Sequence, residues 1–210
     1  MRNFLEAAIK YSNLGYSPIP IMPPKADMEG KDENKKPPIS WKPFQTRKPT
    51  EEEIRGWSQK YPSSRIALIT GKNSNLTVLD CDTKEARERI EEFLPDSLIT
   101  PIAKTPRGGE HLYFAYEETI PTKAGILPGL DVRNNGGYII TSPSPGLNGT
   151  QYQWLPDLAL GEVQPAEMPP ALLSFLPKHN TQQETPERNI SFKKGTRDEG
   201  LFHIALGMAK

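Results

Sequence analysis

The chain has 210 residues and equal numbers of acidic and basic side chains, so its formal net charge is zero. This length suits one domain with a sizeable core plus a small appendage. The zero net charge gives no global support for nucleic-acid binding. With 22 prolines, 16 glycines and 35% hydrophobic residues, the composition is that of a globular chain with many turns rather than a disordered one.

Composition also argues against membrane-spanning and disulfide-bonded proteins. No apolar run approaches the roughly 18 residues needed to cross a bilayer, and Glu6 interrupts the apolar N-terminal segment. We therefore expect a cytoplasmic protein with no membrane partner. The single cysteine, Cys81, allows no internal disulfide and no cysteine-rich zinc site, so no zinc is expected.

The first sixty residues predict two amphipathic helices separated by a strand and a long loop. Residues 3–15 and 50–61 each begin with a capping-box pattern and carry an apolar stripe at helical spacing. A short strand, residues 17–22, follows the first helix. Residues 23–49 are rich in proline and lysine, and a loop of this length suggests a function.

The middle of the chain predicts strands on either side of a third helix. Residues 66–70 and 76–82 are apolar runs around a turn, which indicates a hairpin. Residues 84–94 carry apolar side chains at helical spacing. Residues 102–105 then lead through a Pro-Arg-Gly-Gly turn into a strand, residues 110–116.

The last third of the chain predicts one more hairpin, a short helix and a break between domains. Residues 130–141 place two strands around an Asn-Asn-Gly-Gly turn, and Pro170 opens the helix. We expect a main domain over residues 1–177, a linker over residues 178–195, and the first helix of a following module over residues 196–210. The chain is therefore expected to be a fragment or module of a longer protein. Hairpins together with helices predict an α+β fold with a mainly antiparallel sheet flanked by helices.

Residues 76–82 end an apolar run with two carboxylates. Alternate side chains of a strand share a face, so Asp80 and Asp82 lie on one face, roughly 6.5–7 Å apart along the backbone. Like charges this close repel, and a divalent cation such as Mg²⁺ relieves the repulsion because it prefers oxygen ligands. Cys81 lies between them and is expected to face the opposite side as a small core residue. On its own, the pair also fits the solvated end of a strand.

A glycine-rich turn precedes the strand that carries His111. Gly108 and Gly109 let the backbone approach a ligand closely and expose amide donors, while Arg107 and His111 add side-chain donors. Together these groups suit an anion of phosphate size. Taken alone, a Gly-Gly turn followed by a half-buried histidine is the more ordinary interpretation.

A third motif places Asp131 and Arg133 on one face of a strand. Alone, Asp131 reads as a surface aspartate. Combined with Asp80 and Asp82, it gives three carboxylates on two strands, enough to hold one or two metal ions, while the donors around His111 suit a triphosphate. Phosphoryl or nucleotidyl transfer requires this set of groups and needs no serine or cysteine nucleophile.

Residues 31–72 carry a local excess of positive charge, with ten Lys or Arg against five Asp or Glu. Trp41, Phe44 and Trp57 lie among them, a composition that suits a surface for phosphates and stacked bases. An ordinary solvated surface with core aromatics explains the same residues more simply.

Four motifs in order resemble the bifunctional DNA primase/polymerase (prim-pol) domain of the archaeo-eukaryotic primase superfamily: LITGKNSNLTVLDCD, TPRGGEHLYF, GLDVRNNGGYIITSPS and GTQYQW. The resemblance covers residues 5–176 and includes KKPPISW near the start. Four motifs in one order are far more specific than any one of them. The resemblance implies the RRM-like catalytic core of that superfamily and a role in replication of plasmids, phages or other mobile elements.

The resemblance also implies roles for individual residues. Asp80, Asp82 and Asp131 match the aspartates that bind catalytic metal, with Mg²⁺ or Mn²⁺ as the expected ion. His111 matches the histidine that contacts the phosphates of the incoming nucleotide. Further expected nucleotide-binding residues are Arg107, Gly108, Gly109, Arg133, Lys36, which is also a candidate template contact, and Tyr138, a candidate steric gate at the sugar.

The function implied is template-directed nucleotidyl transfer by a DNA primase and/or DNA polymerase with two-metal-ion catalysis. Its partners would be single-stranded DNA template and primer, nucleoside triphosphates, and a possible helicase domain or partner. The segment GTRDEGLFHIALGMA resembles the start of the helical module that follows such domains. Many relatives carry a zinc-binding element, and this chain lacks the cysteines for one.

Other classes of protein share parts of this pattern. Haloacid-dehalogenase-type phosphatases expect threonine or valine two positions after the second aspartate, where this chain has Lys84. Sugar-nucleotide glycosyltransferases give no role to the motif PRGGEH. A catalytically inactive single-stranded-DNA-binding module of the same fold stays as the alternative, although buried like charges have no obvious purpose without catalysis.

Overall fold

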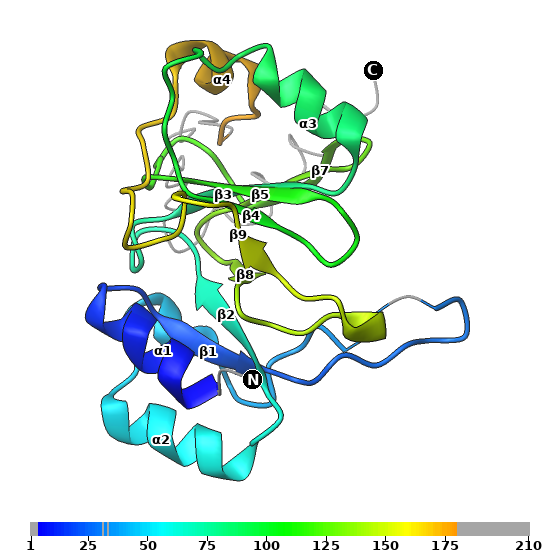
Figure 1. Ribbon diagram of the computed structural model, residues 1–210. Coiled ribbons are helices and arrows are strands. Elements are labelled where there is room, and N and C mark those ends of the chain that lie inside the picture. The colour runs from blue at the N-terminus through cyan, green and yellow to red at the C-terminus, as the bar shows by residue number, and fades with distance from the viewer. Residues whose placement is uncertain (1–3, 31, 33, 180–210) are drawn as a thin grey trace, which may run out of the picture. The chain divides into compact units, whose positions relative to one another are not determined.

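The computed structural model describes residues 4–30, 32 and 34–179, which form two antiparallel sheets and four α-helices (Figure 1). This arrangement confirms the predicted α+β class, while the finer RRM-like type stays a prediction. Residues 180–210 lie outside the described residues, so the division into residues 1–177, 178–195 and 196–210 also stays a prediction. Within the described part, no helix is both long enough and apolar enough to cross a bilayer.

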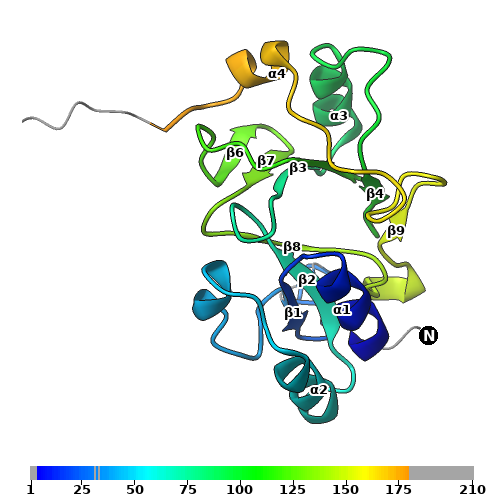
Figure 2. The same cartoon turned by 90° about the vertical axis from the view of Figure 1, so that its left-hand side faces the viewer.

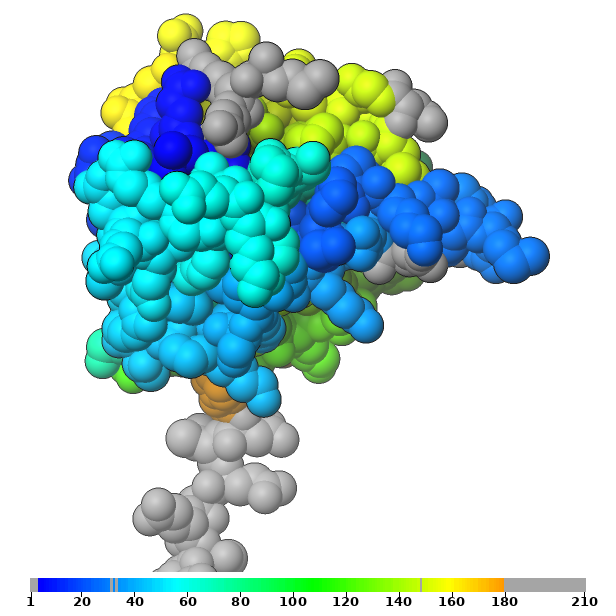
Figure 3. Space-filling model, turned by 90° about the horizontal axis from the view of Figure 1, so that it is seen from below, coloured from blue at the N-terminus to red at the C-terminus, as the bar shows by residue number. Residues whose placement is uncertain are grey.

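The smaller sheet has the strand order β1-β2-β8, formed by β1 (Pro18–Ile21), β2 (Arg65–Ile69) and β8 (Tyr138–Ile140). Helices α1 (Phe4–Asn13) and α2 (Glu51–Lys60) lie side by side against it (Figures 2 and 3). Both helices confirm the predicted ones, and α2 begins with the predicted capping box. The loop after β1, coloured blue, projects at the edge of the face seen in Figure 3.

The larger sheet has the strand order β6-β7-β3-β5-β4-β9, and every adjacent pair is antiparallel. Its strands are β3 (Thr77–Cys81), β4 (Ile102–Lys104), β5 (Glu110–Phe114), β6 (Lys123–Leu127), β7 (Leu130–Arg133) and β9 (Gln153–Trp154). Strand β3 therefore lies inside the sheet, between β5 and β7.

The two faces of β3 pack into different cores. Leu79 and Cys81 lie in a core with α3 (Lys84–Glu91) and α4 (Pro170–Phe175), which cover one face of the larger sheet (Figure 1). Val78, on the other face, joins a core that the two sheets share with α1 and α2. This packing confirms Cys81 as a small core residue.

Two of the predicted hairpins are wrong. Strands β2 and β3 follow one another in sequence but belong to different sheets, and only a single bridge between Gly71 and Leu76 joins the turn. Strands β7 and β8 are divided between the sheets in the same way. The two strands predicted on either side of the Pro-Arg-Gly-Gly turn are present, and the structure shows that they pair as β4 and β5. Because the chain crosses between sheets after β2 and after β7, residues of both sheets meet at one site.

The burial of Cys81 leads to a testable expectation about its reactivity. Burial raises the pKa of the Cys81 thiol to about 12, so at pH 8 the folded protein holds it as an inert thiol. A water-soluble disulfide reagent should therefore modify Cys81 only in chain unfolded by urea, where the thiol returns to an ordinary pKa. Rapid modification of the folded protein would contradict the assignment of Cys81 to the core face.

Candidate active site

Three functional side chains lie in a row across the larger sheet. Asp80 on β3 is the direct strand partner of Asp131 on β7 and of His111 on β5. Directly opposed residues of antiparallel strands point to the same face, so the register gathers all three on one face. Two aspartates directly opposite each other destabilise strand pairing. Their placement inside the sheet therefore indicates a function rather than a contribution to folding.

Asp80 is the most enclosed of the three predicted carboxylates. Its side chain is 16% exposed, and the imidazole Nε2 of His111 lies 3.1 Å from its Oδ1. Burial acts to raise the pKa of Asp80, but the neighbouring imidazole and the charges of Arg133 and Lys35 outweigh burial and hold that pKa below its usual value. Asp80 therefore stays ionised at neutral pH and keeps its oxygens available as ligands.

His111 is buried on the same face, with its ring between two tyrosines. The ring centroid lies 6.3 Å from that of Tyr113 and 5.6 Å from that of Tyr152. Its Nε2 faces Asp80, while Nδ1 is buried and finds no hydrogen-bond partner among the described residues. A buried polar atom without a partner costs roughly 1–3 kcal/mol, which favours a polar ligand or water beside this ring.

The other two carboxylates pair with arginines. Asp131 accepts hydrogen bonds from the Gly125 amide and from Nη2 of Arg133, both at 2.7 Å. Asp82, directly after β3, accepts one from Nη2 of Arg107 at 2.8 Å. With the carboxylates turned to these partners, no three His, Cys, Asp or Glu side chains in the described part of the chain are gathered as a metal site.

The Gly-Gly turn acts through its close approach to β3. A Cβ at position 109 would lie 2.4 Å from the carbonyl oxygen of Cys81, so only glycine fits there. Gly108 adopts a φ of +89°, a conformation that favours glycine. The amides of Gly108 and Gly109 both donate to Thr105 at 3.0 Å, so they close the turn and do not point to a ligand as predicted. The turn thereby holds Arg107 at the end of β3.

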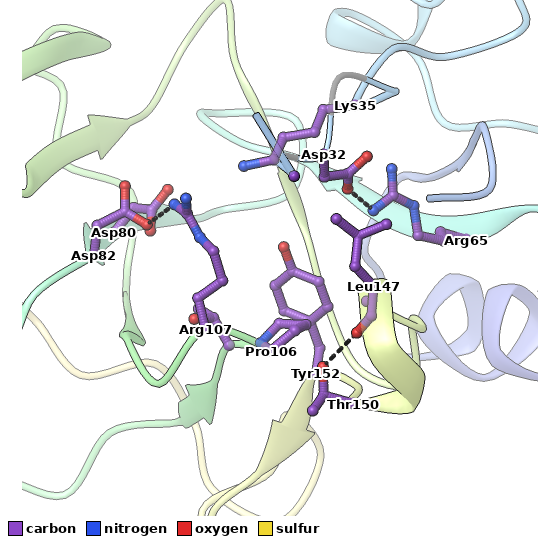
Figure 4. A pocket seen from close by; sticks show the side chains of 13 residues that line it. Asp32, Lys35, Arg65, Asp80, Asp82, Pro106, Arg107, Leu147, Thr150 and Tyr152 are labelled. Atoms are coloured by element: carbon purple, nitrogen blue, oxygen red, sulfur yellow. Dashed lines mark hydrogen bonds and ion pairs between the residues drawn. The ribbon is translucent and has the colours of Figure 1, made fainter. Parts of the chain in front are cut away.

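A cavity of about 460 Å³ lies between the end of β3 and the loop that follows β1 (Figure 4). On one side it is lined by Asp80, Asp82 and Arg107, and on the other by Asp32, Lys35 and Arg65 (Figure 4). Tyr152 lies between these groups. The volume is within the usual range for small-molecule sites, and the lining combines carboxylates with cations.

A smaller cavity of about 230 Å³ lies on the other side of Asp80. Arg133, Trp41 and Tyr138 line it, and the two aromatic rings meet edge to face with their centroids 5.0 Å apart. Asp80, Lys35 and Tyr152 line both cavities. The two cavities therefore meet at Asp80, the central carboxylate of the row.

Most of the predicted site residues meet around Asp80, but Lys36 does not. The Lys36 side chain is exposed and lines neither cavity, whereas its neighbour Lys35 lines both. The prediction also missed Arg65, and it left Tyr152 unassigned although that residue lies in the motif GTQYQW. Lys35 and Lys36 are neighbours in a loop without periodicity, so the sequence gives no indication of which of them faces the cavity.

Two of the aromatic residues in the basic segment, residues 31–72, pack into the core. Phe44 and Trp57 meet edge to face, with centroids 5.0 Å apart, and pack into the core beside the smaller sheet. This packing agrees with the simpler interpretation for those two rings. Trp41 differs because it lines the smaller cavity.

The fold brings strand carboxylates together with lysine and arginine side chains around one cavity. Residues 8–171 match the family described as bifunctional DNA primase/polymerase, N-terminal. The match covers most of the chain, so the protein belongs to this family, as the resemblance predicted. Membership supports a place in DNA replication with DNA and nucleotides as substrates, and the family generally uses divalent metals. A comparison with curated proteins gave no match.

The close approach of the Gly-Gly turn gives a stability prediction with an internal control. Gly109→Ala should destabilise the fold by about 1–3 kcal/mol, because its Cβ meets backbone atoms that cannot move aside cheaply. Gly56→Ala, in the interior of α2 with open space around its Cβ, should instead stabilise by about 0.5–1 kcal/mol. Urea unfolding measures both, and equal stabilities for the two variants would contradict the packing at position 109.

Proposed function

We propose that the protein is a template-directed nucleotidyltransferase that acts as a DNA primase and/or DNA polymerase. The register of β3 carries this proposal, because it sets Asp80 beside Asp131 on one neighbouring strand and His111 on the other. Family membership supports the class of activity, and the register connects that activity to particular side chains. A plasmid, phage or other mobile element is the proposed replication context, on the resemblance alone.

The donor chemistry of the site fits a hard divalent cation. Asp80, Asp82 and Asp131 offer carboxylate oxygens, which Mg²⁺ and Mn²⁺ prefer as ligands. Two of these carboxylates are paired with arginines, so they would exchange an arginine for the ion on binding. One or two bound ions would supply activation of the attacking hydroxyl and stabilisation of the leaving pyrophosphate.

The arginines of the site are proposed to bind the nucleotide's phosphates. Each guanidinium presents paired N–H donors that match phosphate oxygens as well as they match a carboxylate. If Arg107 leaves Asp82 and Arg133 leaves Asp131, each arginine gains a phosphate partner in place of the carboxylate. The positive charge of the metal then offsets that of the carboxylates, while the arginines offset the negative charge of the phosphates. His111, beside Asp80, is proposed as a third phosphate contact.

The remaining contacts and partners are proposed from the two cavities, the exposed loop and the resemblance. Tyr138 lines the smaller cavity at half-burial, where it is proposed to lie beside the sugar of the nucleotide. Lys36, exposed on the loop after β1, is proposed as a contact to template DNA. A single-stranded template with its primer completes the substrates, and a helicase domain or partner is proposed from the resemblance.

Replacing Asp80 should remove nucleotide transfer while leaving DNA binding intact. Asp80→Ala is expected to lower extension of a primed DNA template, with deoxynucleotides and Mg²⁺ or Mn²⁺, by about 10²–10³-fold or more, because the central carboxylate is lost. Binding of single-stranded DNA should change by less than about twofold. Asp96→Ala, which removes an exposed carboxylate outside both cavities, is the matched control.

Two results of this experiment would contradict different parts of the proposal. Extension that survives Asp80→Ala would refute the role of that carboxylate. A wild-type chain that binds single-stranded DNA but never extends a primer would favour the inactive binding module over the enzyme.

Metal binding has a separate readout that needs no activity. Millimolar Mn²⁺ should raise the melting temperature of the wild-type protein, because a ligand that binds only the folded state stabilises it. Asp131→Asn keeps the size of the side chain but removes its charge, and it should abolish most of this rise. Asp96→Asn should keep the full rise. An equal rise in all three proteins would place the ion elsewhere.

A further inference from the structure

We propose that Lys35 contacts the triphosphate of the nucleotide, and that a buried ion pair between Arg65 and Asp32 positions the backbone that carries it. This inference rests on the proposed function. It replaces Lys36 by its neighbour as the lysine that binds nucleotide.

Lys35 has the position of a ligand contact. It lines both cavities together with Asp80, and its side chain extends from the loop side of the larger cavity toward Arg107 and Asp80 (Figure 4). Its ammonium makes no hydrogen bond or ion pair with any residue that the structure describes. An unpaired cation that faces a cavity lined by carboxylates and arginines is suited to a compact anion such as a phosphate.

A single buried guanidinium anchors the loop that presents this lysine. Arg65, at the start of β2, has a fully buried side chain. Its Nε donates to the carbonyl of Met22 and its Nη2 to the carbonyl of Asn34, both at 2.8 Å, while Nη1 pairs with the Asp32 carboxylate. One rigid fork of donors therefore binds the loop at its start, at Met22, and again further along, at Asp32 and Asn34.

The backbone around Lys35 is held on every side. Asn34 before it is bound by Arg65, and the amide of Met22 donates to the carbonyl of Lys36 after it at 3.1 Å. The carbonyl of Lys35 itself accepts a hydrogen bond from the Tyr138 hydroxyl at 3.0 Å. These hydrogen bonds fix the backbone of Lys35, while its side chain extends to the cavity.

The Arg65–Asp32 pair is difficult to explain as a device for stability. Such a largely buried ion pair gains little over a well-packed apolar pair of similar volume, because Arg65 loses its hydration and Asp32 loses most of its own. Its geometric effect is specific, since it fixes the direction of the loop. We therefore assign Arg65 and Asp32 as positioning residues and Lys35 as the residue that touches the substrate.

Equilibrium binding of two probes, dATP and inorganic tripolyphosphate, tests the contact without any need for catalysis. Lys35→Ala in the full chain should raise the dissociation constant of both probes by about 10- to 100-fold, because a charge-assisted contact is lost. Lys35→Arg should recover part of that loss. Lys42→Ala removes an exposed lysine that lies outside both cavities, in the 3-10 helix Lys42–Gln45, and this variant should bind both probes as the wild type does.

Lys36→Ala is the arm that decides between the neighbouring lysines. If Lys36→Ala weakens both probes and Lys35→Ala does not, the inference is overturned in favour of Lys36. If Lys35→Ala and Lys36→Ala weaken the binding of dATP but not of tripolyphosphate, the lysines contact the nucleoside and the assignment to the triphosphate is wrong.

Asp32→Asn tests the positioning role in the primer-extension assay. It should raise the nucleotide KM while kcat stays within about twofold, and its effect should not add to that of Lys35→Ala, because the two residues act through one contact. Arg65→Lys, which keeps the charge but loses the fork, provides the same test if Asp32→Asn does not fold. Additive effects would reduce the ion pair to a structural role.

The outcomes also separate this inference from the proposed function. A chain that binds dATP in a Lys35-dependent manner but never extends a primer would uphold the inference and refute the polymerase. A chain that extends primers, with Lys35→Ala equal to the wild type in KM and in binding, would refute only the inference.

Discussion

The site depends on one pairing of strands, in which Asp80 and Asp131 lie directly opposite each other inside a sheet. The pairing is unfavourable by itself, because it sets two negative charges side by side on a half-buried face. The surrounding structure offsets this cost with cations and donors, placing His111 beside Asp80 and Arg133 beside Asp131. The arrangement therefore keeps carboxylates and cations side by side in one sheet.

The register of β3 is specified by packing on both sides of the strand. Leu79 and Cys81 are buried against α3 and α4, while Val78 is buried in the core between the sheets. A slip of one residue would turn Asp80 into the helix-covered core and expose its apolar neighbours to the cavity. Hydrophobic burial thus fixes the register of β3 although charge repulsion between Asp80 and Asp131 opposes it. The position of the carboxylates therefore depends on the stability of the core.

Local sequence signals predicted the helices well and the strand partners only in part. The capping box of α2 and the core side of Cys81 follow from neighbours within a few residues, and both are confirmed. The hairpin predictions failed at Gly71 and after Arg133, because a turn signal does not reveal whether the next strand returns to the same sheet. The position of Lys35 on both cavities was missed for a related reason, since it depends on Arg65, thirty residues away in the chain.

The two halves of the site are built on different principles. The acidic half stands on regular strands, where the ladder of backbone hydrogen bonds sets each side chain within a narrow range. The basic half stands partly on a loop, which has no ladder, and a buried guanidinium takes over that task by binding three loop residues at once. Arg65 itself belongs to β2, so the loop inherits its position from a strand of the smaller sheet. The distance between the carboxylates and the lysine across the cavity is therefore set by how the two sheets pack, which makes the shared core between them part of the functional site.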